Sequence, residues 1–216
     1  MRILRGGIAG LLLLSLTACV GEAGLKPGAT YNGDAEAGLV LIKTWAGAEN
    51  RLLSLRPFDT TQKRLVPYAG ETLRHSHGYV LEADGTLQKS DDITKPRYHL
   101  LPLKVADYVI ASLYVTEKAR NTTICFSNGT YAFRANSGEI LVLGAINING
   151  PTTTQMGGMG TSPSSMFDIA LPKDEAEKVL NAFGTGGVPA RYYTERPTSF
   201  VNGTSLLGSK DVCGGF

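Results

Sequence analysis

Residues 107–148 read DYVIASLYVTEKARNTTICFSNGTYAFRANSGEILVLGAINI, and this stretch decides the fold class. Its first residues alternate in character: Val109, Ala111, Leu113 and Val115 share one face, and the residues between them share the other. Successive side chains of a β-strand point to opposite faces of the sheet. The alternation therefore predicts a strand with one apolar face turned toward a core.

The dipeptide Asn128-Gly129 lies between two runs of β-prone residues. Asn-Gly suits a type I′ turn, which requires positive φ angles at both central positions. The pattern predicts an antiparallel hairpin of residues 122–126 and 130–135. A further turn is expected at Asn136-Ser137-Gly138. Residues 139–148 then stay apolar at successive positions, which predicts a central strand with both faces buried.

Outside this stretch, four more segments have the composition of β-strands: residues 38–45, 51–58, 78–83 and 97–104. Asp84-Gly85 follows the third of them and predicts a tight turn. Pro102 has no amide hydrogen, so the fourth segment should lie at a sheet edge or end there. Residues 191–201 are a candidate for a last strand.

Residues 173–183, KDEAEKVLNAF, follow a proline and have the apolar period of a helix. Asp174 and Glu175 suit the first turn of a helix, and Gly184 suits the position after its last turn. The buried face should hold Ala176, Val179, Leu180 and Phe183. We therefore predict a mainly β protein: a single antiparallel β-sandwich over residues 39–216, with one C-terminal helix.

The N-terminal residues have the pattern of an export signal. Arg2 and Arg5 precede an apolar run, residues 8–16, which is too short to span a membrane. The run ends in Leu16-Thr17-Ala18-Cys19, which resembles the lipobox of bacterial lipoproteins. The resemblance implies cleavage between Ala18 and Cys19, so that residues 1–18 are a signal peptide and the Cys19 thiol carries diacylglycerol. The alternative is an ordinary secretory signal that contains a cysteine.

Residues 19–38 have no apolar period and are rich in Gly and Ala, which predicts a flexible tether between the lipid and the domain. In lipoproteins of enteric-type bacteria, Asp directly after the lipidated cysteine retains the protein at the inner membrane. This chain has Val20 there. The resemblance therefore implies an anchor in the outer membrane, with the domain facing the periplasm.

The net charge of the whole chain is +2, from 21 basic and 19 acidic residues. Removal of Arg2 and Arg5 with the signal peptide leaves 21 − 2 = 19 basic residues against 19 acidic ones, a formal charge of zero. This balance argues against a nucleic-acid partner. It also means that attachment to the membrane depends on the covalent lipid, because there is no polybasic patch.

A second resemblance concerns the body of the chain. It is carried by residues 103–110 (LKVADYVI) and by Cys125-Phe126, Gly138-Glu139-Ile140 and Gly144-Ala145-Ile146. These residues are similar to a family of small bacterial lipoprotein domains with a carboxypeptidase-regulatory, transthyretin-like fold. The resemblance implies a β-sandwich and transfers no functional residue to this chain.

The third cysteine makes the total odd, and assigning Cys19 to the lipid leaves an even pair, Cys125 and Cys213. In an oxidising compartment these two can form a disulfide that ties the C-terminal tail to the body. The alternative is a buried Cys125 and a free Cys213.

His75, His77 and His99 are the candidate metal ligands. Residues 75 and 77 would share one face of a strand, so both imidazoles could reach one ion, with His99 as a third ligand. The alternative is a solvated loop. The Gly-rich residues 157–162 lack the lysine of a phosphate-binding loop, and they belong to a long loop, residues 149–165, which is a candidate contact surface.

The sequence contains no nucleophile motif such as G-x-S-x-G, and it implies no cofactor. Our first hypothesis is therefore a non-enzymatic envelope lipoprotein that acts through an envelope protein partner. The second is a periplasmic binding module for a small ligand, cell-wall glycan or metal. The third is an envelope hydrolase, which would need a buried carboxylate or a histidine of perturbed pKa in a cleft.

Overall fold

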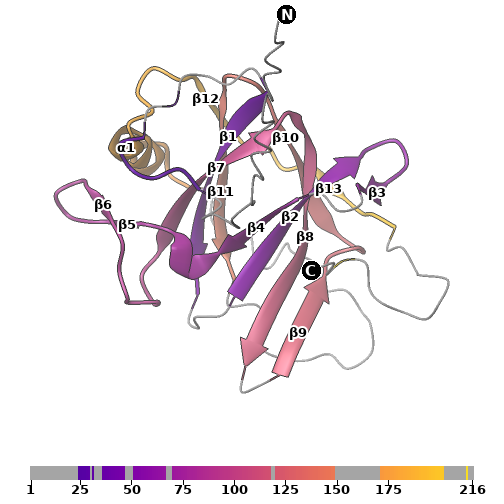
Figure 1. Cartoon of the computed structure of the whole chain (residues 1–216). Coiled ribbons are helices and arrows are strands. Elements are labelled where there is room, and N and C mark those ends of the chain that lie inside the picture. The colour runs from indigo at the N-terminus through magenta and orange to yellow at the C-terminus, as the bar shows by residue number, and fades with distance from the viewer. Residues whose placement is uncertain are drawn as a thin grey trace, which may run out of the picture.

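The computed structural model describes residues 24–29, 31, 36–46, 51–66, 70–117, 120–148, 171–201 and 213. Within these residues the protein is mainly β with a single α-helix, as predicted (Figure 1). Most strands belong to two sheets, one of four strands and one of seven, and two short strands form a separate pair.

The four-stranded sheet has the order β12-β11-β1-β7. Its strands are β12 (Ala190–Tyr192), β11 (Ile140–Asn147), β1 (Ala37–Trp45) and β7 (Arg97–Lys104). β1 and β7 pair antiparallel, as expected, whereas β11 runs parallel to both β1 and β12. The prediction of purely antiparallel pairing is wrong for those two pairs. Parallel neighbours need a long crossover, and most of the seven-stranded sheet lies between β1 and β11 in the chain.

The seven-stranded sheet has the order β13-β10-β8-β2-β3, with β4 also pairing to β2 and β9 to β8. The bounds are β2 (Arg51–Asp59), β3 (Arg64–Leu65), β4 (Glu71–Arg74), β8 (Ala106–Glu117), β9 (Arg120–Cys125), β10 (Thr130–Ala135) and β13 (Pro197–Thr198). A short 3₁₀ turn, η1 (His75–His77), follows β4. The separate pair, β5 (Val80–Leu81) and β6 (Leu87–Gln88), flanks the Asp84-Gly85 turn, as predicted.

The hairpin predicted at Asn128-Gly129 does not form. β9 and β10 both pair antiparallel with β8, β9 along its second half and β10 along its first. The amide of Phe126 donates to the Ala111 carbonyl, and the Thr130 hydroxyl donates to the Ile110 carbonyl. The chain therefore turns locally at Asn128-Gly129 and continues along the same neighbour. The local signal predicted the turn, but the length of β8 decides the pairing.

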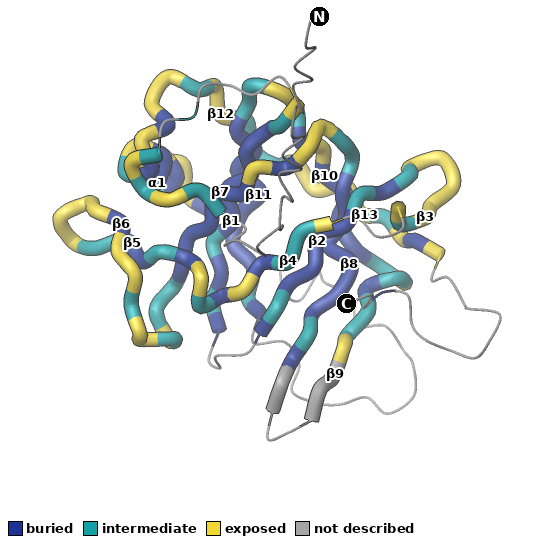
Figure 2. The backbone as a smooth tube through the Cα atoms, in the orientation of Figure 1, coloured by how far each residue is buried: buried dark blue, intermediate teal, exposed yellow. Residues whose placement is uncertain are grey.

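The four-stranded sheet is buried on both faces (Figure 2). Alternate residues, such as Val40 and Ile42 of β1, join residues of the seven-stranded sheet in one core cluster. The residues between them, such as Leu39 and Leu41, pack instead against α1 (Lys173–Phe183). This arrangement explains why β1 and β11 are apolar at successive positions, and it confirms that β11 is a central strand.

The helix has the predicted bounds and the predicted buried face, which consists of Ala176, Val179, Leu180 and Phe183. Gly184 ends it with φ +82°, a left-handed conformation that costs glycine little, and its amide bonds to carbonyls of the last turn. Full burial of a Val, Leu or Phe side chain contributes about 1.5–3 kcal/mol. Packing on the sheet therefore dominates the stability of this short helix.

The predicted flexible tether is wrong for its described part. The amide of Leu25 donates to the Leu100 carbonyl at 2.7 Å, and the amide of Gly28 donates to the Phe183 carbonyl at 3.2 Å. Leu25 and Tyr31 pack against the cluster between the helix and the sheet. Backbone hydrogen bonds and two apolar side chains thus hold this Gly-rich segment on the domain. The docked segment lies along β7, which is the edge strand that Pro102 predicted.

Cys125 and Cys213 form a disulfide, with Cα atoms 5.7 Å apart. Cys213 is fully buried against the outer face of the seven-stranded sheet, in a cluster with Phe58, Val109 and Phe200. The Ser112 hydroxyl donates to the Cys213 carbonyl at 3.0 Å. Of the two alternatives for the cysteine pair, the structure has the bridge.

Candidate functional site

Two of the three candidate histidines meet in the interior. Thr44 on β1, His75 in η1 and His99 on β7 are all buried. The Thr44 hydroxyl oxygen lies 2.8 Å from Nδ1 of His75 and 3.0 Å from Nε2 of His99. Nε2 of His75 lies 3.0 Å from the carbonyl of Ile93. The three side chains therefore form a continuous buried chain of hydrogen bonds, which we call the His-Thr-His chain.

The carbonyl of Ile93, at one end of this chain, determines which atom donates in each hydrogen bond. A carbonyl only accepts, so Nε2 of His75 carries the hydrogen and its Nδ1 is the acceptor. The Thr44 hydroxyl then donates to His75, and its oxygen accepts from Nε2–H of His99. The single hydroxyl of Thr44 thus donates in one of these bonds and accepts in the other, so one side chain pairs with one nitrogen of each imidazole.

Both imidazoles are neutral at pH 7. Burial, helped by the nearby charge of Arg97, lowers the pKa of His75 to about 4, although the bond to Ile93 opposes the shift. Burial and neighbouring positive groups also hold the pKa of His99 well below its usual value. A buried charge without a counter-ion is costly, and here the histidines avoid it by staying uncharged.

The third candidate ligand, His77, does not take part in the His-Thr-His chain. Residues 75–77 form a 3₁₀ turn instead of the predicted strand, so His75 points into the core and His77 is exposed. Both ring nitrogens of His75 already have partners. Among the described residues, no group of three His, Cys, Asp or Glu side chains could hold a metal ion. The predicted three-histidine arrangement is therefore wrong in its geometry.

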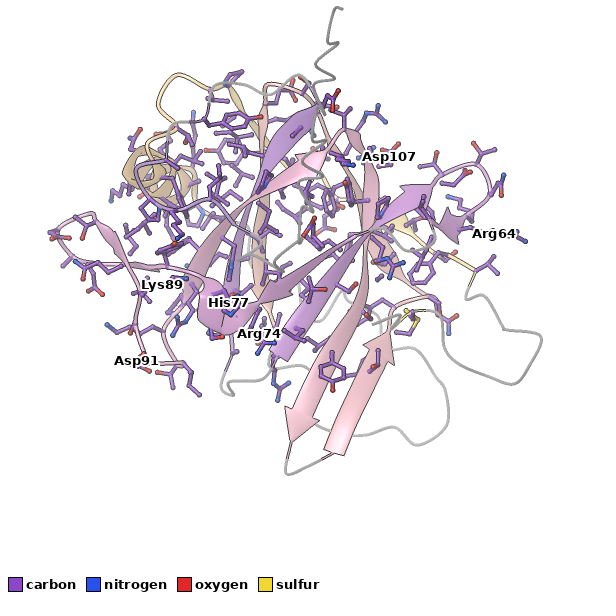
Figure 3. All side chains as sticks on the ribbon, viewed as in Figure 1. Arg64, Arg74, His77, Lys89, Asp91 and Asp107 are labelled. Atoms are coloured by element: carbon purple, nitrogen blue, oxygen red, sulfur yellow. A yellow bond between two sulfur atoms is a disulfide. The ribbon has the colours of Figure 1, made fainter. Side chains whose placement is uncertain are left out.

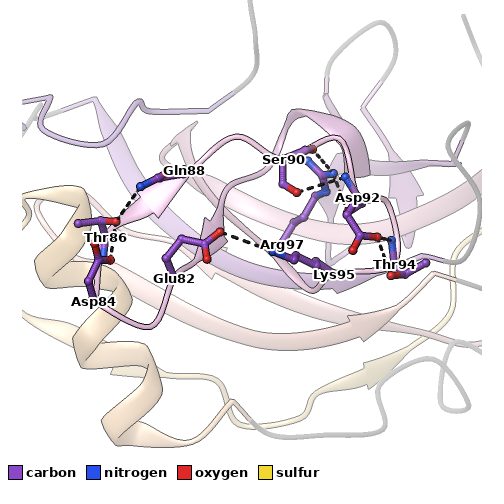
Figure 4. Close-up of polar contacts among 9 residues, drawn as sticks. All are labelled: Glu82, Asp84, Thr86, Gln88, Ser90, Asp92, Thr94, Lys95 and Arg97. Carbon is purple, nitrogen blue, oxygen red and sulfur yellow. Dashed lines mark hydrogen bonds and ion pairs between the residues drawn. The ribbon is translucent and has the colours of Figure 1, made fainter.

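Arg97 holds the loop that covers this region. Its guanidinium is buried and donates to four carbonyls: Ser76 at 3.2 Å, Gly78 at 3.5 Å, Ser90 at 2.5 Å and Asp92 at 3.1 Å. Figure 4 shows the two bonds to the loop and the Asp92 carboxylate accepting from Thr94. Arg97 thus ties η1 to residues 90–92 and keeps Ile93 in place for His75.

Gly78 makes this packing possible. A Cβ atom at this position would lie 2.6 Å from the His99 ring and 2.7 Å from Cβ of Arg97. The close approach requires glycine, because neither neighbour is the far end of a flexible side chain. The sequence shows Gly78 only as one of many glycines, so nothing in it announced this role.

A small pocket lies between the edges of β4 and β7, next to the His-Thr-His chain. Its lining includes Gly24, Arg74, His77, Tyr79 and His99. Its volume is about 20 Å³, which is room for about one water molecule. A histidine of lowered pKa beside a pocket is what the hydrolase hypothesis requires. However, Nε2 of His99 is bound to Thr44, and none of the described lining residues is a carboxylate.

A second polar cluster joins the helix to the sheet. Nζ of Lys43 lies 2.6 Å from Oε1 of Glu175, and the Tyr98 hydroxyl donates to the same oxygen. Lys43 also lies near the rings of Tyr98 and Trp45. Burial and the Glu175 carboxylate raise the pKa of Tyr98, so its hydroxyl stays protonated and keeps donating. These groups bind one another, and their role is to fix α1 on the sheet.

Several predicted features lie outside the described residues: Ala18 and Cys19, and the long loop at residues 149–165 with its Gly-rich part. In the part of the chain that the structure covers, no helix has the length and apolar character to cross a membrane.

Comparison of this chain with protein-family models, with curated proteins and with solved structures finds no match.

Proposed function

We propose that the protein is an envelope lipoprotein, anchored by Cys19 in the outer membrane and facing the periplasm, that acts non-enzymatically through contacts with an envelope protein. The observation that carries this proposal is the sequence Leu16-Thr17-Ala18-Cys19 directly after a short apolar run. Acyl chains contribute about 0.8 kcal/mol for each buried CH₂ group, and two or more chains give stable anchoring.

Two features of the fold support the proposal. The Cys125–Cys213 disulfide suits an oxidising compartment such as the periplasm. The buried polar groups that resemble catalytic machinery bond to one another: Thr44 to both imidazoles, Arg97 to four carbonyls, and Glu175 to Lys43 and Tyr98. In the described part of the chain, these groups hold neighbouring elements together.

The anchor is tested with a Cys19→Ser variant of the full chain. The wild-type protein should sediment with membranes and partition into the detergent phase of Triton X-114, whereas the variant should lose both properties. Ser15→Ala is the matched control, because it changes the same segment and leaves the lipobox intact. Mass spectrometry of the N-terminal peptide should find diacylglycerol on Cys19. A Cys19→Ser protein that stays wholly in the membrane fraction would contradict the anchor.

The contact role is tested by crosslinking in intact cells followed by mass spectrometry. We expect a reproducible crosslink to an envelope protein that disappears when Cys19→Ser releases the domain from the membrane. If crosslinks are absent at all reagent concentrations that crosslink known envelope complexes, the contact role fails.

One observation favours a second candidate, a periplasmic binding module for a metal or another small ligand: His77 and His99 line the same pocket. Calorimetric titration with Zn²⁺ or Cu²⁺ tests the metal, with His77→Ala as the control. Heat of binding that the substitution abolishes would favour this candidate, and no heat in the wild-type protein would exclude it for these two ions.

A further inference from the structure

Gly24 and Leu25 contact the domain, and they lie only a few residues after Cys19, the predicted lipid attachment site. The amide of Leu25 donates to the Leu100 carbonyl, and its side chain packs against the core. Gly24 lies against the same strand, since a Cβ atom built on it would be 3.5 Å from the Leu100 carbonyl oxygen. Gly24, on the edge of β7, is therefore the described residue nearest in sequence to Cys19.

The distance from Gly24 to the lipid is limited by covalent geometry. Five residue steps separate Cys19 from Gly24, from 24 − 19 = 5. A fully extended chain spans at most about 3.6 Å for each residue, so the reach is about 18 Å. A globular domain of this chain length is roughly 40 Å across. The tether is thus shorter than about half the domain, and the domain cannot turn its far side to the membrane.

The surface next to Gly24 has the chemistry of a headgroup contact. Arg74 and His77 line the same pocket as Gly24, and both are exposed (Figure 3). Nearby, Nζ of Lys89 bonds to the His77 carbonyl and lies 4.3 Å from the centre of the Tyr79 ring. Lys26, two residues beyond Gly24, is exposed as well. Cationic and aromatic side chains are the types that favour the headgroup region of a bilayer.

The acidic side chains of this region lie outside the pocket that Gly24, Arg74 and His77 line. Asp91 lies on the loop beyond Lys89, and Glu82 forms an ion pair with Lys95 at 3.7 Å. Among the described residues, no acidic side chain lines the pocket beside Gly24. Arg64, on β3, lies further along the same edge of β2 (Figure 3): Arg64 pairs with Asp59 and Arg74 pairs with Leu52. These partners are 59 − 52 = 7 residues apart, which is about 23 Å along a strand.

We propose that the short chain between Cys19 and Gly24 holds the face that carries Gly24, Arg74 and His77 against the phospholipid headgroups. The end of the β2 edge that carries β3 and Arg64 then lies further from the headgroups. The inference rests on the proposed lipid anchor and adds to it a fixed orientation of the domain. It also places the surface available to an envelope protein on the side away from Gly24.

The experiment uses the full lipidated protein in phosphatidylcholine and phosphatidylglycerol vesicles. Arg74→Cys and Arg64→Cys variants are labelled with the environment-sensitive fluorophore NBD. No other thiol competes, because Cys19 is acylated and Cys125 is bridged to Cys213. Vesicles containing lipid with a nitroxide on its headgroup quench probes that lie at the bilayer surface. We expect at least threefold stronger quenching at position 74 than at position 64.

The controls separate this inference from the anchor. Sedimentation with vesicles, and its loss in the Cys19→Ser protein, reports the anchor alone. Anchored protein with equal quenching at positions 74 and 64, or stronger quenching at 64, overturns the orientation and leaves the anchor intact. If the wild-type protein does not sediment with the vesicles, both the anchor and the orientation are contradicted. His77→Cys provides a second probe on the same face, in case Arg74→Cys does not fold.

A variant with a longer tether tests whether the short chain between Cys19 and Gly24 fixes the orientation. Insertion of about 20 Gly and Ser residues after Glu22 removes the limit on reach, since such linkers behave as flexible coils. The difference in quenching between positions 74 and 64 should then shrink toward zero. An unchanged difference would contradict orientation by the short chain.

Discussion

Thr44 accepts one hydrogen bond and donates another, and both partners are buried imidazoles. A single hydroxyl therefore pairs with one nitrogen of each of two buried imidazoles. Buried polar groups without a partner cost about 1–3 kcal/mol each, so this residue has a larger effect on stability than its size suggests.

Replacing Thr44 by Val keeps the shape and removes the hydroxyl. Both His75 and His99 then lose a partner, and we expect the free energy of unfolding to fall by about 2–4 kcal/mol. Urea unfolding followed by circular dichroism measures the change. Thr44→Ser is the matched control, because it keeps the hydroxyl and loses only a methyl group. The idea fails if the Val and Ser variants unfold at the same urea concentration.

The same network makes stability depend on pH. Burial lowers the pKa of folded His75 from an ordinary 6.5 to about 4, so between these pH values the unfolded chain binds a proton that the folded protein does not. Stability from this group is complete above about pH 6.5 and is lost as the pH falls toward 4. The lowered pKa of His99 acts in the same direction.

We therefore expect the urea midpoint of the wild-type protein to fall between pH 7.5 and pH 5. A His75→Gln variant should be less stable at pH 7.5 and should change less over this range. The difference between the two proteins separates the histidine effect from that of surface carboxylates. Parallel curves for the two proteins would show that His75 does not contribute.

At the scale of elements, η1 is held on β7 by close backbone packing. Gly78 ends this 3₁₀ turn, and its Cα lies against the His99 ring and the stem of Arg97. Arg97 then links the turn to the following loop through four carbonyls. The turn, the strand and the loop should therefore unfold together.

Substitution of Gly78 by Ala should destabilise the protein by about 1–3 kcal/mol, the usual cost of overpacking a tight core. Thermal unfolding measures the effect. Gly186→Ala is the matched control, because a Cβ atom there meets nothing within 4 Å and its φ angle does not demand glycine. A Gly78→Ala protein as stable as the control would mean that the turn moves away from β7 without cost.

At the scale of the whole molecule, the two sheets share one core cluster and the helix closes the other face of the four-stranded sheet. The outer face of the seven-stranded sheet is covered by residues from the C-terminal part of the chain. There the disulfide brings Cys213 onto β9, from 88 residues further along the chain, and completes a small cluster with Phe200.

Removal of this cross-link should lower the free energy of unfolding by about 4–5 kcal/mol, because an open chain has more conformations than a closed loop of this length. The Cys125→Ala, Cys213→Ala double variant and the reduced wild-type protein should unfold at similar urea concentrations. Reductant should leave the double variant unchanged. Two titratable thiols in the denatured, unreduced wild-type protein would contradict the bridge.

The features predicted well are those determined by neighbouring residues. The period of residues 173–183 and the glycine after them predicted α1 and its buried face, because side chains three and four residues apart always share a helix face. Asp84-Gly85 predicted its turn, and Pro102 predicted an edge, because each restricts the backbone at its own position. The mainly β fold was predicted from the alternation of apolar and polar residues, which is also a property of neighbouring residues.

The features predicted wrongly depend on residues far apart in the chain. Asn128-Gly129 cannot reveal that β8 is long enough to pair with both β9 and β10. The composition of residues 19–38 cannot reveal that Leu25 and Tyr31 find an apolar site beside the helix. The spacing of His75 and His77 suggested a shared ligand, whereas the 3₁₀ turn separates them.

Neighbouring residues were enough to predict α1, the strands β1, β2 and β7 to β11, and the turn at Asp84-Gly85, and they carry the lipobox pattern at Cys19. Long-range packing is needed to explain that Thr44 joins His75 to His99, that β11 runs parallel to β1, and that Gly24 and Arg74 line one pocket. Local structure follows from the backbone preferences of adjacent residues. Contacts between distant residues follow from which arrangement buries the apolar faces and satisfies the buried polar groups together.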